Sequence, residues 1–496
     1  MVDEYRRGYA DFNAERTREY YLFLSGQKAT LDLAPIYDRH GELFTRDSIE
    51  RLRAELDRTP EHFETQRAST SRLLIFASEQ FLETSVTQLT EEINEREASA
   101  TICWNGREIS FQDASAELAS ERDRSSRQEI HARRAAVIEA SNDLRFERLL
   151  KLHAGARALG ASTYVALYED IKRLDYPGIA RDAASVLIQT EARYLAALDE
   201  GLVREFGSRI RHPERHDAIY LLHLTRYDDR FPAGKLLRIY AATMAGLGIR
   251  VASQANILID GELRPRKTCR AFCMPILVPD DIRLVIRPVG GQSDYQSLFH
   301  EVGHAQHYGG ASASLAPEFK YTGDYALTET YAFLFNHLIS ERSWLAEFLG
   351  LNDSSEFVRA VMLARLVTVR RYVAKLAYEC QLHLGGDLTE ASALYAELQT
   401  AATRFRTDGT EFLFDLDDSF YAASYLRAWA FEVALREHLK TRFGNRWWAS
   451  RRAGDFLKQM WETGDRHTAD EMASQVGIGP IGFDLLIDEF NQTLKD

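Results

Sequence analysis

The sequence is poor in the residues that cross-link or interrupt a chain. Its 496 residues include only 4 cysteines, 11 prolines and 29 glycines. The cysteines form no closely spaced framework, which argues against a disulfide-rich secreted domain and predicts free thiols in a reducing compartment. So few prolines and glycines leave few breaks in secondary structure, and they favour long helices over many short strands and turns.

Long apolar runs and basic tracts are also missing. The longest apolar stretch, Ile239–Ile249, has 11 residues, whereas a membrane-spanning helix needs about 18 or more. The first residues, Met1–Arg7, precede no apolar core, so no secretory signal is expected. The 61 Lys and Arg residues stand against 74 Asp and Glu residues, a net charge of −13. Such an acidic chain is a poor candidate for nucleic-acid binding, and the sequence predicts a soluble cytoplasmic protein.

Helical patterns dominate what is present. Apolar residues recur at spacings of three and four through Thr70–Glu92, and similar segments follow along most of the chain. Two regions differ. Asn105-Gly106 lies between two short β-prone runs and predicts either a small hairpin or a loop between helices. The region Ile249–Pro288 is rich in β-branched residues, and its Pro279–Asp281 segment predicts a hairpin turn. From Ser293 onward the sequence reads as helical again.

One helical segment carries the residues of a metal site. Ser293 and Gln296 form a capping box that predicts the start of a helix, and Gly309-Gly310 predicts its end. Within it lies His300-Glu301-Val302-Gly303-His304, an HExxH motif. Histidines four residues apart share one helix face and can bind one metal ion. Glu301 adjoins the first histidine and can act as a general base toward a water molecule there. The structural alternative is a buried helix with two hydrogen-bonded histidines.

A zinc hydrolase of this type needs a third donor and keeps a fourth position open for water. The HExxHxxGxxH extension is absent, because His307 and then a glycine pair follow His304. The donor is therefore expected from a second helix, predicted over 324–338. Glu329 lies near the start of that helix, 25 residues after His304, and two histidines with a glutamate are the ligand set of thermolysin. Alternatively, the helix dipole alone favours a glutamate at this position.

Five further residues could contribute to the site or only to the fold. His307 could contact a ligand or the substrate, or it could be a solvated or capping histidine. Asp324 could orient a ligand imidazole or cap its helix. Gly303 is unfavourable in a helix interior, so it is expected to permit close packing against the metal site. Tyr421 and Tyr425 share one helix face and could donate to an oxyanion, or they could be core aromatic residues.

Together these motifs resemble the thimet oligopeptidase / oligoendopeptidase F family of zinc peptidases. The segment Leu298–His307 is similar to that family's HE(F/L)GHALH helix, and Glu329 falls at its third-ligand spacing. Leu159–Tyr168 resembles its LG(Y/F)xSYxE(L/Y) segment, and Ile259–Cys273 resembles its Asp…Arg/Pro…Lys…Ala-Phe-Cys stretch. Tyr425, followed by leucine, matches its transition-state tyrosine. The resemblance extends from about residue 100 to the end, and residues before it match only in helical character.

The resemblance implies a mostly α fold, a two-lobed helical metallopeptidase with a deep substrate channel and a small β-sheet next to the HExxH helix. Residues 1–110 would form an N-terminal helical region and residues 111–496 the catalytic region, within one continuous bilobed body. An edge strand, either Arg270–Met274 or the run 283–287, would pair with the peptide backbone. The substrate-contacting residues would be Ala271, Phe272, Cys273 and His307.

The sequence therefore predicts a zinc metallopeptidase that hydrolyses short peptides. The two motif histidines and Glu329 would hold one zinc ion, Glu301 would be the general base, and Tyr425, with Tyr421, would donate to the oxyanion. One alternative is a metallocarboxypeptidase or dipeptidyl carboxypeptidase of related helical fold, which needs a cationic pocket for the terminal carboxylate. Another is a metal-binding relative without catalysis. Short peptides are the expected partners, with no nucleic acid and no membrane, and the sequence leaves the oligomeric state open.

Overall fold

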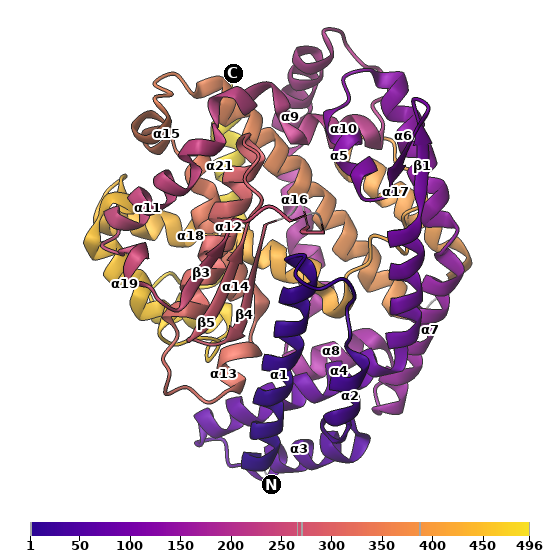
Figure 1. The fold of residues 1–496 in the computed structure, drawn as a ribbon, viewed down its shortest axis with the longest axis vertical. Coiled ribbons are helices and arrows are strands. Elements are labelled where there is room, and N and C mark those ends of the chain that lie inside the picture. The colour runs from indigo at the N-terminus through magenta and orange to yellow at the C-terminus, as the bar shows by residue number, and fades with distance from the viewer. Residues whose placement is uncertain (1, 265, 269–270, 386–387, 496) are drawn as a thin grey trace. The chain divides into compact units, whose positions relative to one another are not determined.

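The computed structural model describes residues 2–264, 266–268, 271–385 and 388–495. Helices dominate the fold and strands are few and short (Figure 1). The mostly α architecture predicted from the scarcity of proline and glycine is therefore confirmed. Within the described residues, no helix combines the length and the apolar character that a membrane crossing requires.

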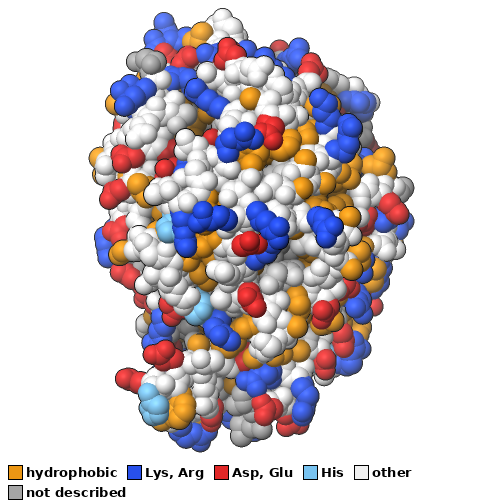
Figure 2. All heavy atoms as spheres, turned by 90° about the vertical axis from the view of Figure 1, so that its left-hand side faces the viewer, with side chains coloured by type: hydrophobic (Ala, Val, Ile, Leu, Met, Phe, Trp, Pro, Cys, Tyr) orange, Lys and Arg blue, Asp and Glu red, His pale blue; other side chains and the backbone are white. Residues whose placement is uncertain are grey.

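Charged side chains of both signs cover the face drawn in Figure 2. Lys and Arg side chains are interspersed there with Asp and Glu side chains. Because opposite charges alternate over short distances, their fields partly cancel over this face. The excess of 74 acidic over 61 Lys and Arg residues is thus not gathered into one patch in this view.

The chain forms two compact units, each built from discontinuous segments. The first unit comprises Met1–Ser78, Arg226–Val358 and Arg427–Leu486, and the second comprises Glu79–Thr225, Arg359–Leu426 and Ile487–Asp496. The boundary expected near residue 110 lies inside a continuous segment of the second unit. The chain passes between the units five times, and three of the crossings lie within long helices, namely α4 (Glu64–Ser99), α16 (Ser355–His383) and α18 (Tyr421–Phe443). A helix interior carries no break signal in the sequence, so these boundaries could not be predicted.

The first unit contains both the small sheet and the predicted HExxH helix. Its helices are α1 (Val2–Leu24), α2 (Ala34–Arg39), α3 (Arg46–Arg58), α11 (Leu236–Gly246), α12 (Gln292–Gly310), α13 (Glu318–Tyr321), α14 (Tyr325–Asn336), α15 (Arg342–Leu349), α19 (Arg451–Trp461) and α20 (Ala469–Gln475). The last helix of the chain, α21 (Asp484–Thr493), begins in this unit and ends in the other.

Three strands form the sheet in the order β3–β5–β4. Strand β4 (Phe272–Leu277) pairs antiparallel with β5 (Asp281–Val285), which confirms the hairpin predicted around Pro279. Strand β3 (Ile257–Asp260) pairs parallel with β5. Strand β5 is therefore central, and β3 and β4 are the edges. The apolar side chains of Ile282 and Ala305 are buried in one cluster, so the sheet packs against α12.

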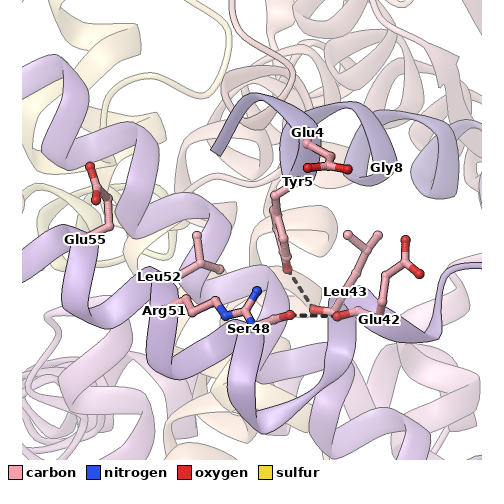
Figure 3. Close-up of a pocket in the computed structure, with 9 residues that line it drawn as sticks. All are labelled: Glu4, Tyr5, Gly8, Glu42, Leu43, Ser48, Arg51, Leu52 and Glu55. Atoms are coloured by element: carbon pink, nitrogen blue, oxygen red, sulfur yellow. Dashed lines mark hydrogen bonds between the residues drawn. The ribbon is translucent and has the colours of Figure 1, made fainter. Parts of the chain in front are cut away.

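A pocket lies in the N-terminal part of the first unit (Figure 3). It is formed by α1, the short 3-10 helix η1 (Gly41–Phe44) and α3, and its lining residues are Glu4, Tyr5, Gly8, Glu42, Leu43, Ser48, Arg51, Leu52 and Glu55. The Tyr5 hydroxyl donates to the backbone carbonyl of Leu43 at 2.9 Å across it. None of the predicted catalytic or metal-binding residues lines this pocket.

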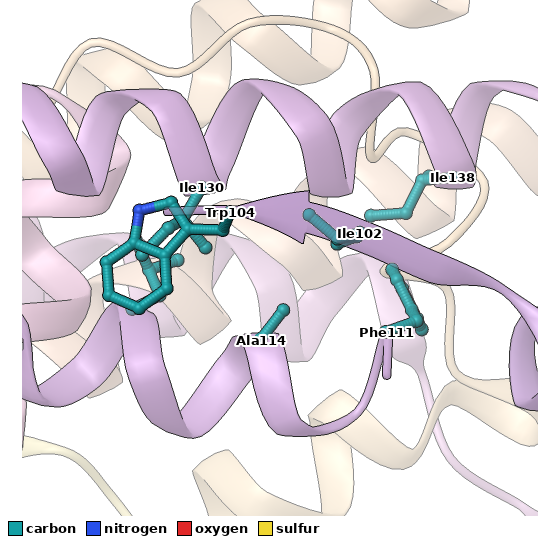
Figure 4. Close-up of a cluster of buried hydrophobic side chains, with 7 residues drawn as sticks. Ile102, Trp104, Phe111, Ala114, Ile130 and Ile138 are labelled. Carbon is teal, nitrogen blue, oxygen red and sulfur yellow. The ribbon is translucent and has the colours of Figure 1, made fainter. Parts of the chain in front are cut away.

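The second unit contains the other predicted hairpin. Strand β1 (Thr101–Trp104) pairs antiparallel with β2 (Arg107–Ser110), so the loop interpretation of this region is wrong. Asn105 and Gly106 both have positive φ, 51° and 71°, as a two-residue turn between twisted strands requires. Alternate residues of β1 are buried, and Ile102 and Trp104 pack between two helices (Figure 4). The helices of this unit are α5 (Asp113–Ser120), α6 (Arg124–Glu139), α7 (Asn142–Ala158), α8 (Tyr164–Lys172), α9 (Tyr176–Phe206), α10 (Arg215–His223) and α17 (Ala391–Thr403).

Candidate metal centre

Helix α12 begins differently from the prediction. It starts at Gln292 with Gly291 as its N-cap, and no side chain at the N-cap position caps it. The capping box of Ser293 and Gln296 is therefore wrong. The Asp228 carboxylate, 64 residues earlier in the chain, accepts the hydrogen bond from the Gln292 N–H at 3.0 Å. An acceptor from a distant part of the chain thus takes the place of the predicted local cap. The predicted end of the helix at the glycine pair is confirmed, since α12 ends at Gly310.

Gly303 brings α12 into close contact with α14. A Cβ atom at Gly303 would lie 2.4 Å from the carbonyl oxygen of Tyr331 and 2.5 Å from the Cα atom of Ala332. Both are backbone atoms of α14, which cannot move aside as a flexible side chain can. The packing role predicted for Gly303 is therefore confirmed, and the approach places the motif histidines opposite Glu329.

Three side chains from these helices converge. The donor atoms of His300, His304 and Glu329 all lie within 4.8 Å of one another. The His300 Nε2 atom is 3.4 Å from Glu329 Oε2, and the His304 Nε2 atom is 3.7 Å from Glu329 Oε1. When four ligand atoms surround a zinc ion in a tetrahedron at 2.0–2.1 Å from the metal, they lie about 3.4 Å from one another. The donor set therefore fits zinc, and the described residues contain no other such group of three donors.

The position of Glu329 in its helix favours a ligand over a dipole-stabilised glutamate. Helix α14 begins at Tyr325 and has no acidic residue in its first turn, so Glu329 lies beyond the reach of most of the dipole effect. Its side chain is buried, with an exposed fraction of 2%. A carboxylate is rarely buried this completely unless it is paired or bound to a metal.

Both histidines carry neutral imidazoles at neutral pH. Burial lowers the pKa of His300 to about 4. Burial, together with the proximity of His300 and His307, lowers the pKa of His304 well below its ordinary value. A neutral imidazole has one nitrogen lone pair available for a metal, whereas an imidazolium has none. The protonation state of the pair therefore suits metal binding.

Glu301 lies beside this group without belonging to it. Its Oε2 atom accepts a hydrogen bond from the backbone N–H of Cys273 at 2.8 Å. Burial and the negative charge of Glu329 raise the pKa of Glu301 to about 8, while the Cys273 N–H acts in the opposite direction. A dication in the site would favour the ionised carboxylate. The position suits a proton acceptor.

The Cys273 hydrogen bond connects the site to the edge of the sheet. Cys273 lies on β4, an edge strand, and pairs with Leu284 of β5 on the other side. Of the two substrate strands that the family resemblance allows, the run 283–287 is wrong, because β5 is paired on both edges. Strand β4 remains, with Phe272 and Cys273 at its start and Ala271 immediately before it; Arg270 lies outside the described residues.

His307 is a packing residue in this structure. Its side chain is completely buried, with its ring 5.0 Å from the Tyr331 ring and 5.1 Å from the Tyr308 ring. Burial lowers its pKa, and the charge of Asp465 acts in the opposite direction. The interpretations as a solvated histidine or a substrate contact are therefore corrected. His307 lies on the same helix face as His300, two turns further along, where Tyr331 of α14 covers its ring.

Asp324 caps α14 and does not contact a ligand imidazole. Its carboxylate accepts from the Ala326 N–H at 3.2 Å and from Arg427 Nη1 at 2.9 Å. Burial opposes its ionisation, but the charge and hydrogen bond of Arg427 outweigh burial and lower the pKa of Asp324 to about 2. The capping interpretation is therefore confirmed, and the ion pair fastens α14 to α18.

The two predicted tyrosines lie at the start of α18, in the segment that belongs to the second unit. Their rings contact each other, with centroids 5.1 Å apart. The Tyr425 ring also contacts Tyr372 of α16, again at 5.1 Å. They share a helix face, as the spacing of four predicts, and both are partly buried.

Sequence reasoning missed Thr328. Its Oγ1 atom is 2.9 Å from Nδ1 of His304, the ring nitrogen opposite the one that faces Glu329. The only sequence signal is its place next to Glu329, and a threonine inside a helix usually bonds its own backbone.

Comparisons with known proteins identify the fold. No protein-family model matches the sequence, and no curated protein matches it. Among solved structures, the chain is similar to the structure described as PZ peptidase A with inhibitor 2, with a TM-score of 0.70. The match covers 98% of this chain and 90% of that one at 14% sequence identity. At this identity the likeness shows the fold, a mostly helical one, over nearly the full chain, including the first hundred residues.

Proposed function

We propose that the chain is a zinc metallopeptidase that hydrolyses short peptides. One observation carries the proposal: the donor atoms of His300, His304 and Glu329 lie within 4.8 Å of one another, with a separate carboxylate, Glu301, beside them. Three protein donors plus one uncommitted carboxylate is the arrangement of a hydrolytic zinc site. The similarity of the fold to a protein named as a peptidase supports this choice of reaction.

The chemistry divides between the metal and the chain. His300, His304 and Glu329 would hold the zinc ion, which would polarise the scissile carbonyl and lower the pKa of a water molecule. Glu301 accepts the proton of the attacking water and returns it to the leaving amine. The Cys273 N–H donates a hydrogen bond to Oε2 of Glu301. This hydrogen bond holds the carboxylate in place, and the other oxygen, Oε1, carries the proton.

The edge of the sheet offers a binding site for the peptide main chain. We place the substrate along β4, next to Ala271, Phe272 and Cys273. At Cys273 only the carbonyl oxygen can pair with the substrate, because its N–H is donated to Glu301. Main-chain pairing uses groups that every peptide has, so it suits a broad range of sequences. Pro275 lies within β4 and has no N–H to donate. Pairing with a substrate therefore weakens at this residue, which limits the length of peptide that β4 can hold.

Tyr425, with Tyr421, completes the proposal as the donor to the oxyanion. The family resemblance supports this role, and a tyrosine hydroxyl is a suitable donor where negative charge develops. The deep substrate channel that the resemblance implies is part of the same proposal.

A mixed peptide library read by mass spectrometry tests the proposed function. We expect internal cleavage by the zinc-loaded protein, loss of cleavage after chelation and recovery when zinc is restored. Removal of single residues or dipeptides from the C-terminus would instead identify a carboxypeptidase or dipeptidyl carboxypeptidase. Stoichiometric zinc without any cleavage would identify a non-catalytic relative.

Two variants separate the roles of the carboxylates. Glu301→Gln should keep about one zinc per chain but lose about 10²–10⁴-fold in turnover, because only the base is removed. Glu329→Ala should lose zinc affinity, because two imidazoles alone make an incomplete site. Near-normal turnover by zinc-loaded Glu301→Gln contradicts the base assignment. Unchanged zinc affinity in Glu329→Ala contradicts the ligand assignment.

A further inference from the structure

The imidazole of His304 is held between two consecutive residues of α14. Its Nε2 atom is 3.7 Å from Glu329 Oε1, and its Nδ1 atom is 2.9 Å from Thr328 Oγ1. The Thr328 side chain is buried, with an exposed fraction of 3%. One edge of the ring thus faces the proposed metal site, and the opposite edge faces a buried hydroxyl.

The ring of Tyr308 lies beside that of His304 on α12, one turn further along. The two rings are inclined at 25° with centroids 6.5 Å apart. The Thr328 hydroxyl faces the His304 ring from α14. A threonine hydroxyl has one donor and two acceptor sites, so it can accept a hydrogen bond from the His304 Nδ1–H.

Thr328 departs from the usual behaviour of a threonine inside a helix. Such a hydroxyl commonly bonds the carbonyl four residues earlier. Thr330, two positions along the same helix, does so, with Oγ1 2.6 Å from the Ala326 carbonyl oxygen. Thr328 reaches across to α12 instead. The two buried threonines of α14 thus have different hydrogen-bond partners, and Thr330 provides a matched control.

We infer that Thr328 is a positioning residue that fixes the tautomer and the orientation of His304 for metal binding. The two neutral tautomers of histidine are close in energy, and only the Nδ1–H form presents a lone pair at Nε2. By accepting from Nδ1–H, Thr328 favours that form and holds the ring plane toward Glu329. Hydrogen-bond partners of this kind typically change metal affinity by about 10–100-fold when they are removed. The inference rests on the proposed metal site.

The test measures zinc dissociation constants by competition with a chromophoric chelator. Thr328→Val keeps the branched shape and removes the hydroxyl, and we expect affinity to fall about 10–100-fold. Thr328→Ser restores the hydroxyl and should recover affinity to within about threefold of the parent protein. Thr330→Val should lower the melting temperature but leave zinc affinity unchanged.

A spectroscopic measurement separates positioning from general destabilisation. Cobalt(II) bound in place of zinc has visible absorption bands that depend on ligand geometry, and Thr328→Val should alter them while Thr330→Val should not. If Thr328→Val does not fold, Thr328→Ala is measured against Thr328→Ser in its place. Equal affinity and an unchanged cobalt spectrum in the hydroxyl-free variant overturn the inference. So does a Thr328→Ser variant as weak as Thr328→Val.

The parent protein distinguishes failure of the inference from failure of the proposed function. A parent protein that binds zinc, with a Thr328→Val variant that binds it equally well, overturns the positioning role alone. A parent protein that binds neither zinc nor cobalt overturns the metal site, and the positioning role with it.

Discussion

Two carboxylates share the proposed site with two neutral imidazoles. Each carboxylate raises the cost of ionising the other, and the charge of Glu329 contributes to the raised pKa of Glu301. A zinc ion carries two positive charges, and Glu301 and Glu329 together supply two negative charges when both are ionised. Because ion–carboxylate attraction is strong where water is excluded, this balance favours binding of a dication over a monocation.

Tyr425→Phe tests the role proposed for the hydroxyl. Loss of one oxyanion donor typically lowers kcat about 10²–10³-fold, because the interaction is made mainly in the transition state. We expect that loss with little change in KM, zinc content or melting temperature. Steady-state kinetics on one cleaved peptide and a thermal melt provide the measurement.

Tyr421→Phe is the matched control for that substitution. It removes the same oxygen from the neighbouring ring, 5.1 Å away between centroids, and should have the milder effect. A larger effect at Tyr421 would exchange the two roles. A lowered melting temperature with normal kcat in Tyr425→Phe would identify a core aromatic residue instead.

Much of the metal site could be predicted from the sequence, and the predictions that were wrong have a geometric cause. The histidine pair and Glu329 follow from helical spacing and from the need for a third donor. The Thr328 and Cys273 contacts join segments that are distant in sequence, so no local pattern encodes them. The wrong interpretations of His307 arise because it shares the helix face of the two ligands but lies two turns after His300, where the contact with Tyr331 of α14 covers it. No local pattern shows that contact.

At the scale of elements, the α12–α14 contact determines the site. The two helices meet at Gly303, between the two histidines, and Glu329 faces them from α14. The elements were partly predictable. Both hairpins carry turn signals: the one at Pro279 was predicted, and the one at Asn105-Gly106 was one of two alternatives. The start of α12 depends on Asp228, and the parallel pairing of β3 depends on a long-range contact. Local signals predict elements well and their tertiary partners poorly.

Gly303→Ala should separate these helices. The new methyl group would lie 2.4 Å from a backbone oxygen of α14, and such overpacking typically costs about 1–3 kcal/mol. We expect a lower melting temperature and weaker zinc binding, measured by thermal melts and chelator competition.

Gly201→Ala in α9 is the control for that substitution. There the methyl group meets only the side-chain tip of Leu363 at 2.7 Å, which can move. Alanine also has the higher helix propensity, by about 1 kcal/mol. Stability should therefore change little, and zinc affinity not at all. Unchanged zinc affinity in Gly303→Ala would show that the helices tolerate separation.

The start of α18 contains a second constrained feature. Ser419 and Phe420 both have φ of 57°, in the left-handed region, immediately before Tyr421. The Phe420 ring is buried and stacks on Tyr176 with centroids 4.4 Å apart. Ser419 donates its N–H to the Tyr164 hydroxyl at 3.2 Å. These contacts hold the backbone in a conformation that costs a residue other than glycine about 1–2 kcal/mol.

Ser419→Gly should therefore stabilise the protein. Glycine adopts positive φ without steric cost and keeps the N–H that donates to Tyr164, so we expect a gain of about 0.5–1 kcal/mol. Ser424→Gly, inside α18, should instead lower stability by a few tenths of a kcal/mol, because glycine is unfavourable in a helix. Denaturant midpoints of both variants test the opposite signs. A loss of stability in Ser419→Gly would show that its side chain contributes more than the backbone conformation costs.

At the scale of the whole molecule, the metal donors and the proposed base belong to one unit. His300, His304, Glu329 and Glu301 all lie in Arg226–Val358 of the first unit. The second unit has cores of its own, including the cluster of Ile102 and Trp104 in Figure 4. The mostly helical fold was predictable from composition, but this division was not, because the chain changes unit inside α4, α16 and α18.

Zinc should consequently stabilise the chain unevenly. A ligand that binds only the folded site adds a free energy set by its concentration relative to Kd, about 4 kcal/mol at 1,000 times Kd. Amide hydrogen exchange should slow by up to about 1,000-fold in α12 and α14, whose local opening releases the metal. Amides of β1, α5 and α6 should exchange at the same rate with and without zinc, because their opening leaves the site intact. Glu329→Ala, measured in parallel, should show no zinc-dependent protection in either region. Equal protection in both units would contradict the prediction, because it would mean that the site opens only when the entire chain unfolds.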